Sequence, residues 1–173
     1  MSTAQMLESD IALGVAVDAD QYLTFLLEGE EYGVDILRVQ EIRGWERTTP
    51  IPNTPDYVQG VINLRGTIVP IIDLRRRFGL PPREYGPTTV VVVLRVESEE
   101  RERTMGIVVD AVSDVYNLPE EEVAPPPDLG SAISIDFVRG LATVEGKMVI
   151  VLDIDRLLNA DALALASGAP EAA

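Results

Sequence analysis

A repeat within the chain is the feature that most constrains its fold. A shift of 80 residues lays Tyr57–Phe78 over Phe137–Leu158 without a gap, and apolar residues match apolar residues at most positions. The identical pairs are Val58/Val138, Gly60/Gly140, Gly66/Gly146, Val69/Val149, Asp73/Asp153 and Arg76/Arg156. A shift of 73 residues aligns the preceding segments, with the pairs Gly33/Gly106, Val39/Val112, Glu41/Asp114 and Ile42/Val115. The sequence therefore predicts two related subdomains that arose by internal duplication.

Each copy of the repeat predicts a β-hairpin followed by a short helix. In the first copy, the β-branched runs Val61–Leu64 and Thr67–Ile72 flank a turn at Arg65–Gly66, where glycine tolerates the backbone angles of a tight turn. Asp73 then has the side chain of a helix N-cap, and Gly79 ends the helix. In the second copy we expect a longer amphipathic helix, because apolar residues recur at helical spacing; these are Ile154, Leu157, Leu158 and Leu165. Gly168 and Pro170 are the expected stop signals of this helix.

The rest of the chain also favours strands. β-rich runs occur at Gln21–Leu27, Tyr32–Ile36, Thr88–Val96, Met105–Asp110 and Val112–Leu118, and a short helical turn precedes a strand at Glu41–Trp45. Residues 88–96 are apolar enough to be buried on both faces. Three prolines in Thr48–Pro55 predict an extended connection without ladder donors, whereas Glu120–Glu122 predict one acidic helical turn. The fold class is therefore all-β with short helices.

The predicted boundaries follow the composition of the connecting segments. Residues 1–20 are acidic without a clear period and predict a flexible tail, and residues 160–173 form the end of the last helix and a second tail. The folded domain spans residues 21–159. The linker Pro81–Pro87 is the candidate for the crossing between the two subdomains.

Charge and residue usage exclude several classes of function. The 173 residues carry 29 acidic and 14 basic side chains, a net charge of −15, which disfavours nucleic acids and anionic membrane surfaces. Cysteine and histidine are both absent, which removes thiolate nucleophiles, the usual general base and the commonest metal ligand. No apolar run approaches the roughly 18 residues of a spanning helix. We therefore expect a cytoplasmic protein that binds other proteins and does not insert into the membrane.

Two sets of residues raise the question of catalysis. Asp73 and Asp153 occupy equivalent positions and are consistent with a shared-proton dyad in a carboxylate-dependent hydrolase, but two helix caps explain them more simply. Arg75–Arg77 are consistent with a phosphate grip, but a solvated helix face is the simpler interpretation. The sequence contains no phosphate loop, nucleophile elbow or cluster with metal spacing. We therefore expect no catalytic, cofactor or metal site.

Arg65 and Glu41 are candidates for binding another protein. Arg65 lies at a hairpin tip, and its counterpart in the second copy is Glu145, so the turn itself does not require arginine. Arginine is enriched at interface hot spots, although an ordinary exposed tip residue is the alternative. Glu41 lies between apolar Val39 and Ile42, which we expect to be exposed with it as part of an interface. Pro70 predicts a strand at a sheet edge or a bulge.

Four stretches of the chain resemble the CheW family of bacterial chemotaxis coupling proteins. These are EEYGVDILRVQEIRG at Glu30–Gly44, YVQGVINLRGTIVPIIDLRRRFG at Tyr57–Gly79, MGIVVDAVSDV at Met105–Val115 and GLATVEGKMVIVLDIDRLL at Gly140–Leu158. The resemblance covers residues 21–159. It implies two intertwined SH3-like five-stranded β-barrels without catalytic activity.

The resemblance also implies partners and a binding site. The expected partners are the regulatory domain of the histidine kinase CheA and the cytoplasmic tips of methyl-accepting chemoreceptors, in membrane-associated arrays. By position, the receptor-contact groove includes Val39, Glu41, Ile42, Gly60 and Arg65. The absence of a receiver segment favours a stand-alone adaptor. A CheW-like paralogue that scaffolds a non-chemotaxis array, for surface motility or a second-messenger output, is the alternative.

Overall fold

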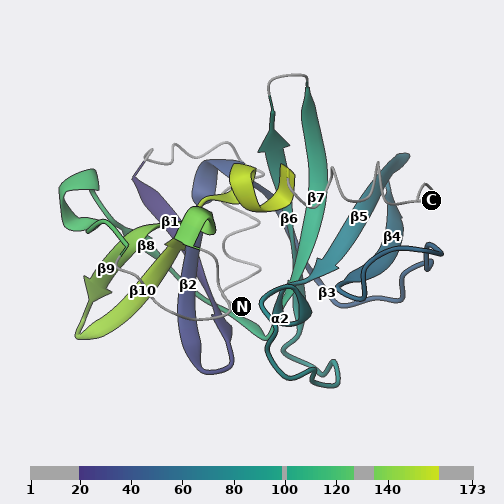
Figure 1. Cartoon of the computed structure of the whole chain (residues 1–173), viewed down its shortest axis with the longest axis horizontal. Helices are drawn as coiled ribbons and strands as arrows, with labels where there is room; N and C mark the ends of the chain where they lie inside the picture. Colours follow the sequence, from purple (N-terminus) through teal and green to yellow (C-terminus); the bar gives the residue numbers. More distant parts are fainter. Residues whose placement is uncertain (1–19, 99–100, 127–134, 160–173) are drawn as a thin grey trace.

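The computed structural model describes residues 20–98, 101–126 and 135–159, and it confirms an all-β fold with short helices (Figure 1). Its strands form two five-stranded sheets with the orders β8-β1-β2-β10-β9, here called barrel A, and β3-β6-β7-β5-β4, here called barrel B. The strands are β1 (Gln21–Leu27), β2 (Glu30–Asp35), β3 (Val39–Gly44), β4 (Val58–Leu64), β5 (Thr67–Asp73), β6 (Val90–Glu97), β7 (Glu102–Val109), β8 (Ala111–Asn117), β9 (Val138–Val144) and β10 (Lys147–Leu152). The helical segments are η1 (Ile36–Arg38), α2 (Leu74–Arg77), η2 (Glu120–Glu122) and η3 (Ile135–Phe137).

Strand registers confirm the internal duplication. Each barrel contains one parallel pair, in which Gly33 of β2 lies opposite Val151 of β10, and Gly106 of β7 lies opposite Ile71 of β5. These four residues are related by the same shifts of 73 and 80 that align the sequence with itself. Barrel A combines β1 and β2 with β8 to β10, whereas barrel B combines β6 and β7 with β3 to β5. The two subdomains are therefore intertwined, because each contains strands from both copies of the repeat.

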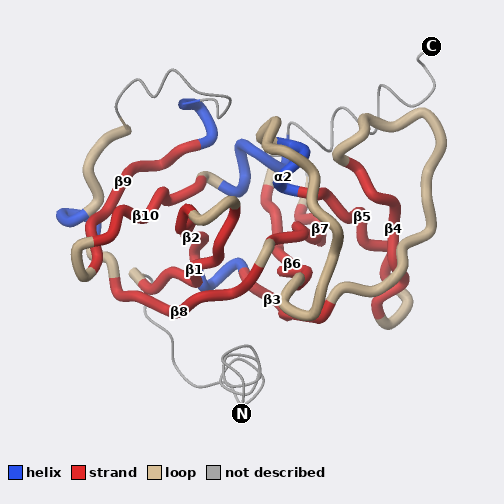
Figure 2. The backbone as a smooth tube through the Cα atoms, turned by 90° about the horizontal axis from the view of Figure 1, so that it is seen from below, coloured by secondary structure: helices blue, strands red, loops and turns tan. Residues whose placement is uncertain are grey.

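Each sheet curls in the manner of an SH3-like barrel, and one residue joins its two edges. Thr49, in the connection after β3, pairs with Val61 of β4, and Ala124, after β8, pairs with Leu141 of β9. Both backbone hydrogen bonds between Thr49 and Val61 are 2.9 Å long. The predicted absence of ladder donors in residues 48–55 is therefore wrong at Thr49, because this residue precedes the prolines and keeps its N–H. Figure 2 shows the long connection between β3 and β4, which runs beside β4.

The chain crosses between the barrels at two short segments. It passes from β2 in barrel A to β3 in barrel B through η1, and it returns at Asp110, between β7 and β8. Residues 81–87, predicted to be the crossing, instead connect α2 with β6, and both neighbouring strands, β5 and β6, belong to barrel B. That prediction is wrong because proline content indicates a loop but carries no information about which sheets the loop joins.

The main hydrophobic core is shared by the two barrels. It includes Phe25 and Val34 from barrel A together with Val92 and Ile107 from barrel B. Strand β6 is buried on both faces as predicted, since Val91 and Val93 pack into a second cluster inside barrel B while Val92 and its alternate neighbours face the shared core. A third cluster fills barrel A. Burial of the shared core holds the barrels against each other, because apolar surface contributes roughly 25 cal/mol per Å² removed from water.

Both predicted helix caps are confirmed. The Asp73 carboxylate accepts a hydrogen bond from the Arg76 N–H at 3.3 Å, and Asp153 accepts the equivalent bond from Arg156 at 3.1 Å. The helix after β10 runs from residue 154 to 159 within the described residues. The expected helical residue Leu165, the expected stop signals Gly168 and Pro170, and nearly all of both predicted tails lie outside the described residues.

The three arginines of α2 do not form a solvated face. Only 4% of the Arg75 side chain is exposed, and its guanidinium contacts the carboxylates of Asp110 at 2.7 Å and of Glu28 at 2.6 Å. Arg77 lies over the rings of Tyr57 and Phe137, the residues that precede the two repeated hairpins. Sequence reasoning missed this because a four-residue helix shows no periodicity, and the partners are remote in the chain. Arg75 and Arg77 therefore help to join the two copies.

Candidate protein-interaction site

Arg65 and Glu41 meet at the end of barrel B. The guanidinium of Arg65 lies 2.7 Å from one carboxylate oxygen of Glu41, and the guanidinium of Arg43 lies 3.0 Å from the other. Glu41 belongs to β3 and Arg65 to the turn after β4, the two edge strands of the sheet, so the curling of the barrel brings them together. The exposed fraction is 74% for the Arg65 side chain but 14% for Glu41. The Arg65 side chain is therefore held through its guanidinium, and most of it is exposed to solvent.

The apolar neighbours of Glu41 are buried, so the expectation that they are exposed beside it is wrong. Val39 and Ile42 are 5% and 3% exposed and belong to the core shared by the barrels. Their spacing of three fits burial because the ladder between β3 and β6 shifts its register between Val39 and Glu41. Such an irregularity lets two residues an odd number apart face the same side of a strand. Because these two side chains are anchored in the core, they fix the course of β3 and with it the position of Glu41.

Gly60 permits a close approach of two backbone segments. Its φ is +132°, and a Cβ atom there would lie 2.3 Å from the carbonyl oxygen of Thr49. Gly140 is the equivalent residue, and its Cβ would lie 2.5 Å from the carbonyl oxygen of Ala124. Gly60 therefore supports the site by allowing the connection after β3 to pair with β4, at the edge that carries Arg65.

Ile68 is an exposed apolar residue that sequence reasoning missed. It lies opposite Asn63 in the hairpin that carries Arg65, and it is 59% exposed. The alternation of side chains along the strand could have identified it, because Ile68 faces the side opposite to Val69 and Ile71, both of which are fully buried. Pro70 lies on the same strand, and β5 is internal instead of at an edge; its pairing with β7 begins one residue after the proline. An apolar side chain thus accompanies the presented arginine.

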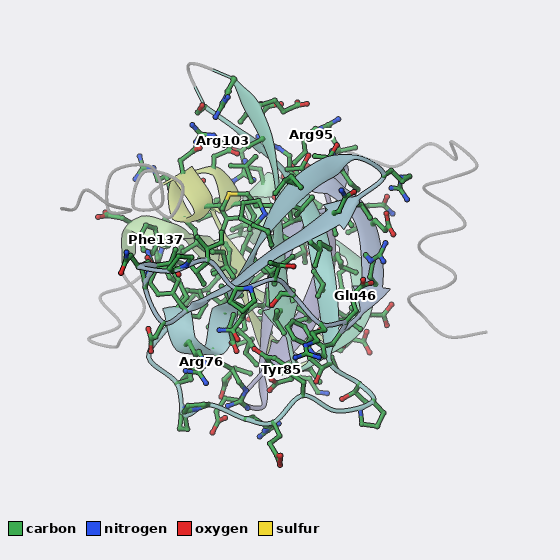
Figure 3. The ribbon with its side chains drawn as sticks, turned by 90° about the vertical axis from the view of Figure 1, so that its right-hand side faces the viewer. Glu46, Arg76, Tyr85, Arg95, Arg103 and Phe137 are labelled. Carbon is green, nitrogen blue, oxygen red and sulfur yellow. The ribbon has the colours of Figure 1, made fainter. Side chains whose placement is uncertain are left out.

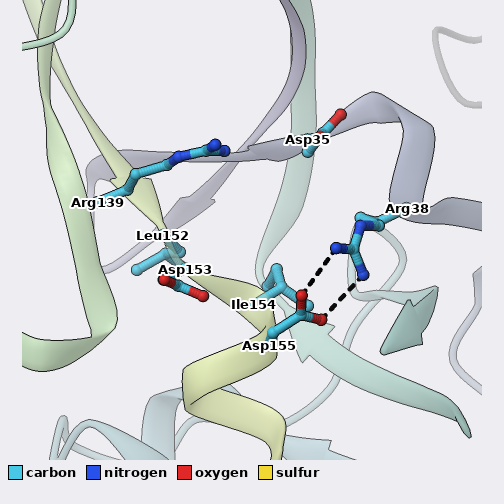
Figure 4. A pocket seen from close by; sticks show the side chains of 7 residues that line it. All are labelled: Asp35, Arg38, Arg139, Leu152, Asp153, Ile154 and Asp155. Carbon is cyan, nitrogen blue, oxygen red and sulfur yellow. Dashed lines mark hydrogen bonds and ion pairs between the residues drawn. The ribbon is translucent and has the colours of Figure 1, made fainter. Parts of the chain in front are cut away.

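A pocket beside the η1 crossing is lined mainly by charged residues. Arg38 of η1 binds Asp155 with two hydrogen bonds of 2.9 and 2.7 Å, and Asp35, Arg139 and Asp153 line the same pocket (Figure 4). Burial opposes the charged form of Arg38, but the hydrogen bond and the charge of Asp155 outweigh this effect and raise its pKa. The bidentate pair fastens the η1 crossing to the helix after β10 and engages both carboxylate oxygens of Asp155.

Asp73 and its surroundings do not resemble a catalytic centre. Asp73 is 3% exposed and accepts a hydrogen bond of 2.5 Å from the hydroxyl of Tyr85, whose ring packs against Trp45. Burial and this hydrogen bond raise the pKa of Tyr85 well above its ordinary value. Figure 3 shows Tyr85 and Arg76 on one side of the molecule, away from Arg95 and Arg103. Asp73 therefore serves as a cap and an anchor for the loop before β6.

Within residues 20–98, 101–126 and 135–159, no group of three or more acidic side chains could hold a metal ion. No helix in this part of the chain is both long and apolar enough to cross a membrane.

The fold and the site together define a class of protein, a scaffold of two intertwined five-stranded β-barrels with exposed hairpin ends. Comparison with known proteins identifies the family. The model for the CheW-like domain matches residues 21–162. The chain belongs to the CheW-like family of chemotaxis scaffold proteins, as its resemblance predicted.

Individual relatives agree with this assignment. The chain is 46% identical over 145 residues to "Chemotaxis protein CheW" of Klebsiella aerogenes, covering 84% of this chain and 85% of the relative. It is 37% identical over 141 residues to the protein of that name from Rhizobium meliloti, covering 82% and 88%. The crystal structure of "scaffolding protein TtCheW" from Thermoanaerobacter tengcongensis matches with a TM-score of 0.72 and 34% identity, covering 83% of this chain and 90% of that one.

Proposed function

We propose that this protein is a non-catalytic adaptor that couples methyl-accepting chemoreceptors to the histidine kinase CheA in the cytoplasm, within receptor arrays. Relatives that share up to 46% of its residues over most of its length are named chemotaxis proteins, and a solved relative is titled a scaffolding protein. The observation that carries the proposal is the Arg65–Glu41 pair, because two candidates 24 residues apart meet at one exposed end of barrel B.

The proposed receptor contact uses the five candidate residues in two ways. Arg65 reaches the receptor directly and Glu41 orients it, since a guanidinium held by a carboxylate loses less freedom on binding than a free side chain. The other three residues contribute indirectly. The buried side chains of Val39 and Ile42 fix the course of β3, and Gly60 allows the connection after β3 to approach β4. Ile68 adds apolar area next to the charge, as is common at protein interfaces.

An adaptor can change kinase activity only by binding the conformations of its partners with different affinities. The core shared by the barrels suits this role, because a partner held at one barrel keeps a defined orientation relative to a partner held at the other. We assign the regulatory domain of CheA as the second partner, on the basis of family resemblance.

Calorimetric titration tests the proposal. The full chain is titrated with the regulatory domain of CheA and then with receptor signalling tips. We expect saturable binding to both, at least tenfold weaker receptor binding by Arg65→Ala, and unchanged kinase binding. Arg101→Ala is the matched control, since this arginine also lies in an exposed hairpin connection. Absence of binding to either partner, or equal loss in the two variants, contradicts the proposal.

A further inference from the structure

The two barrels carry different charges at equivalent ends. In barrel B, Glu41 is neutralised by Arg43 and Arg65. The shifts of 73 and 80 place Asp114, Tyr116 and Glu145 of barrel A at the corresponding positions. Strand registers support this equivalence, because Ile42 lies opposite Val92 in barrel B as Val115 lies opposite Leu23 in barrel A. Both arginines of barrel B therefore lack a basic counterpart in barrel A.

Glu31 adds a buried carboxylate to this end of barrel A. It lies on β2 opposite Val149 of β10, two residues beyond the start of that strand, and is 8% exposed. One of its carboxylate oxygens, Oε2, is fully buried and has no hydrogen-bond partner in the part of the chain that the structure describes. Its counterpart at the shift of 73 is Thr104, which is uncharged. A buried carboxylate oxygen without a hydrogen-bond partner is costly, so its presence indicates a partner from outside the described residues.

Tyr116 lies among these carboxylates. Its ring packs against the cluster inside barrel A that contains Val149, the residue opposite Glu31, and Val144, which directly precedes Glu145, packs against the same cluster. Burial raises the pKa of the Tyr116 hydroxyl, and the negative charges of Glu31, Asp114 and Glu145 raise it further. We call these four residues the acidic end of barrel A. The β9–β10 hairpin tip, to which Glu145 belongs, and the β4–β5 tip, to which Arg65 belongs, lie at opposite sides of the molecule (Figure 1).

No basic residue of the described chain neutralises the acidic end. Within that part of the protein, neither Glu31, Asp114 nor Glu145 has a lysine or arginine nitrogen within 4.0 Å. Lys147, the only lysine, follows the hairpin turn and makes no ion pair among the described residues, and its single charge is smaller than the three negative ones. Met148 beside it is 53% exposed, as is typical of apolar residues at a contact surface.

We infer that the acidic end of barrel A binds an arginine side chain of a partner protein, which supplies from outside the cation that Arg65 supplies within barrel B. Arginine suits the site better than lysine, because its planar guanidinium can pair with two carboxylates and stack on Tyr116. A metal ion fits less well, since no metal-binding group of three acids exists among the described residues.

Nuclear magnetic resonance with a defined probe tests the inference. The probe is a blocked peptide, acetyl-Gly-Gly-Arg-Gly-Gly-amide, and its control contains neutral citrulline in place of arginine. We expect shift changes in the full chain to cluster at residues 31, 114–116 and 145–149, and to be at least threefold smaller with the citrulline peptide. Equal changes with both peptides, or arginine-dependent changes elsewhere, overturn the inference.

Two variants of the acidic end and one control variant make the test specific. Glu145→Arg reproduces the arrangement of barrel B and should abolish the clustered shift changes, and Glu31→Gln should reduce them at least threefold. Glu121→Arg, in the exposed turn η2, makes the same change of net charge as Glu145→Arg and should preserve them. Loss in all three variants indicates a non-specific effect of charge and contradicts the inference.

Melting temperatures of the same variants provide a second test, which applies even if the peptide binds too weakly to detect. Uncompensated negative charge at the acidic end predicts that Glu31→Gln and Glu145→Arg both raise the melting temperature, whereas Glu121→Arg raises it less. If both variants lower the melting temperature, the carboxylates already have partners within the protein and the inference fails.

Discussion

The buried guanidinium of Arg75 provides the sharpest test of how the two barrels are joined. It donates to both oxygens of Asp110, at 2.7 and 2.8 Å, and to the carbonyl oxygen of Pro81 at 2.7 Å. Asp110 is the residue at which the chain returns to barrel A, and it also accepts the N–H of Glu28 in the β1–β2 turn. Arg75→Ala therefore removes the centre of a network that links α2 of barrel B with both a crossing and a turn of barrel A.

The size of the effect follows from burial. Removing one partner of a buried ion pair costs about 3–5 kcal/mol, because the other charge stays buried without compensation. Asp110 is 16% exposed and can regain some hydration, and Glu28 is 44% exposed and contributes little, so we take the lower end, about 3 kcal/mol. A domain of this size loses roughly 2–4 °C in melting temperature per kcal/mol, which predicts a decrease of about 6–12 °C.

Thermal and urea unfolding of Arg75→Ala and Arg83→Ala measures this effect. Arg83 is the matched control, since it approaches Asp110 at 3.4 Å with a side chain that is 59% exposed, and its loss should cost under about 1 kcal/mol. Equal losses in the two variants, both below about 1 kcal/mol, would refute the reasoning.

The same network predicts a dependence on pH. Burial alone raises the pKa of Asp110, but hydrogen bonds from Arg75 and from the Glu28 N–H outweigh it and hold that pKa below its ordinary value of 3.8. A depressed folded-state pKa adds stability above the unfolded-state value, and this stability is lost as the pH falls through the folded-state value. The free energy of unfolding should therefore fall less steeply below about pH 4 in Arg75→Ala than in the unmodified protein.

Three further predictions concern single residues. Asp73→Ala should lower the free energy of unfolding by about 1 kcal/mol for the lost cap, and further because the hydroxyl of Tyr85 loses its acceptor; unchanged urea unfolding would remove both roles. Gly60→Ala should destabilise the protein more than Gly66→Ala in thermal unfolding, because a Cβ atom clashes with a backbone carbonyl at the first position and meets nothing within 4 Å at the second. Arg65→Ala should leave circular dichroism and melting temperature nearly unchanged, since an exposed ion pair contributes at most about 1 kcal/mol; unfolding of this variant would show that Arg65 is structural.

Much of the local structure was predictable because its causes are local. The hairpin around Arg65 and Gly66, both of which have positive φ in the structure, follows from β-branched runs on each side of a turn. The caps Asp73 and Asp153 follow from a side chain that reaches its own helix three residues later. In each case, the interacting groups are only a few residues apart in the chain.

The features that could not be predicted from the sequence depend on contacts between residues that are far apart in the chain. Arg75 was expected to be solvated, but its carboxylate partners lie 35 and 47 residues away, in a crossing and a turn of the other barrel. Val39 and Ile42 were expected beside an exposed acid, but a register shift between β3 and β6 turns both toward the core. The crossing was assigned to residues 81–87 because a proline-rich segment indicates a loop without indicating its destination.

The sequence by itself determined the all-β class, the duplication, the ends of the repeated elements and the family, since each depends on patterns along one stretch of chain or on a repeat of that pattern. Only the tertiary structure decided which strands share a barrel, that Arg65 binds Glu41, and that one carboxylate oxygen of Glu31 is buried without a hydrogen-bond partner among the described residues. These features depend on the curling of two sheets and on strand exchange between the copies, which bring together residues that no local pattern relates.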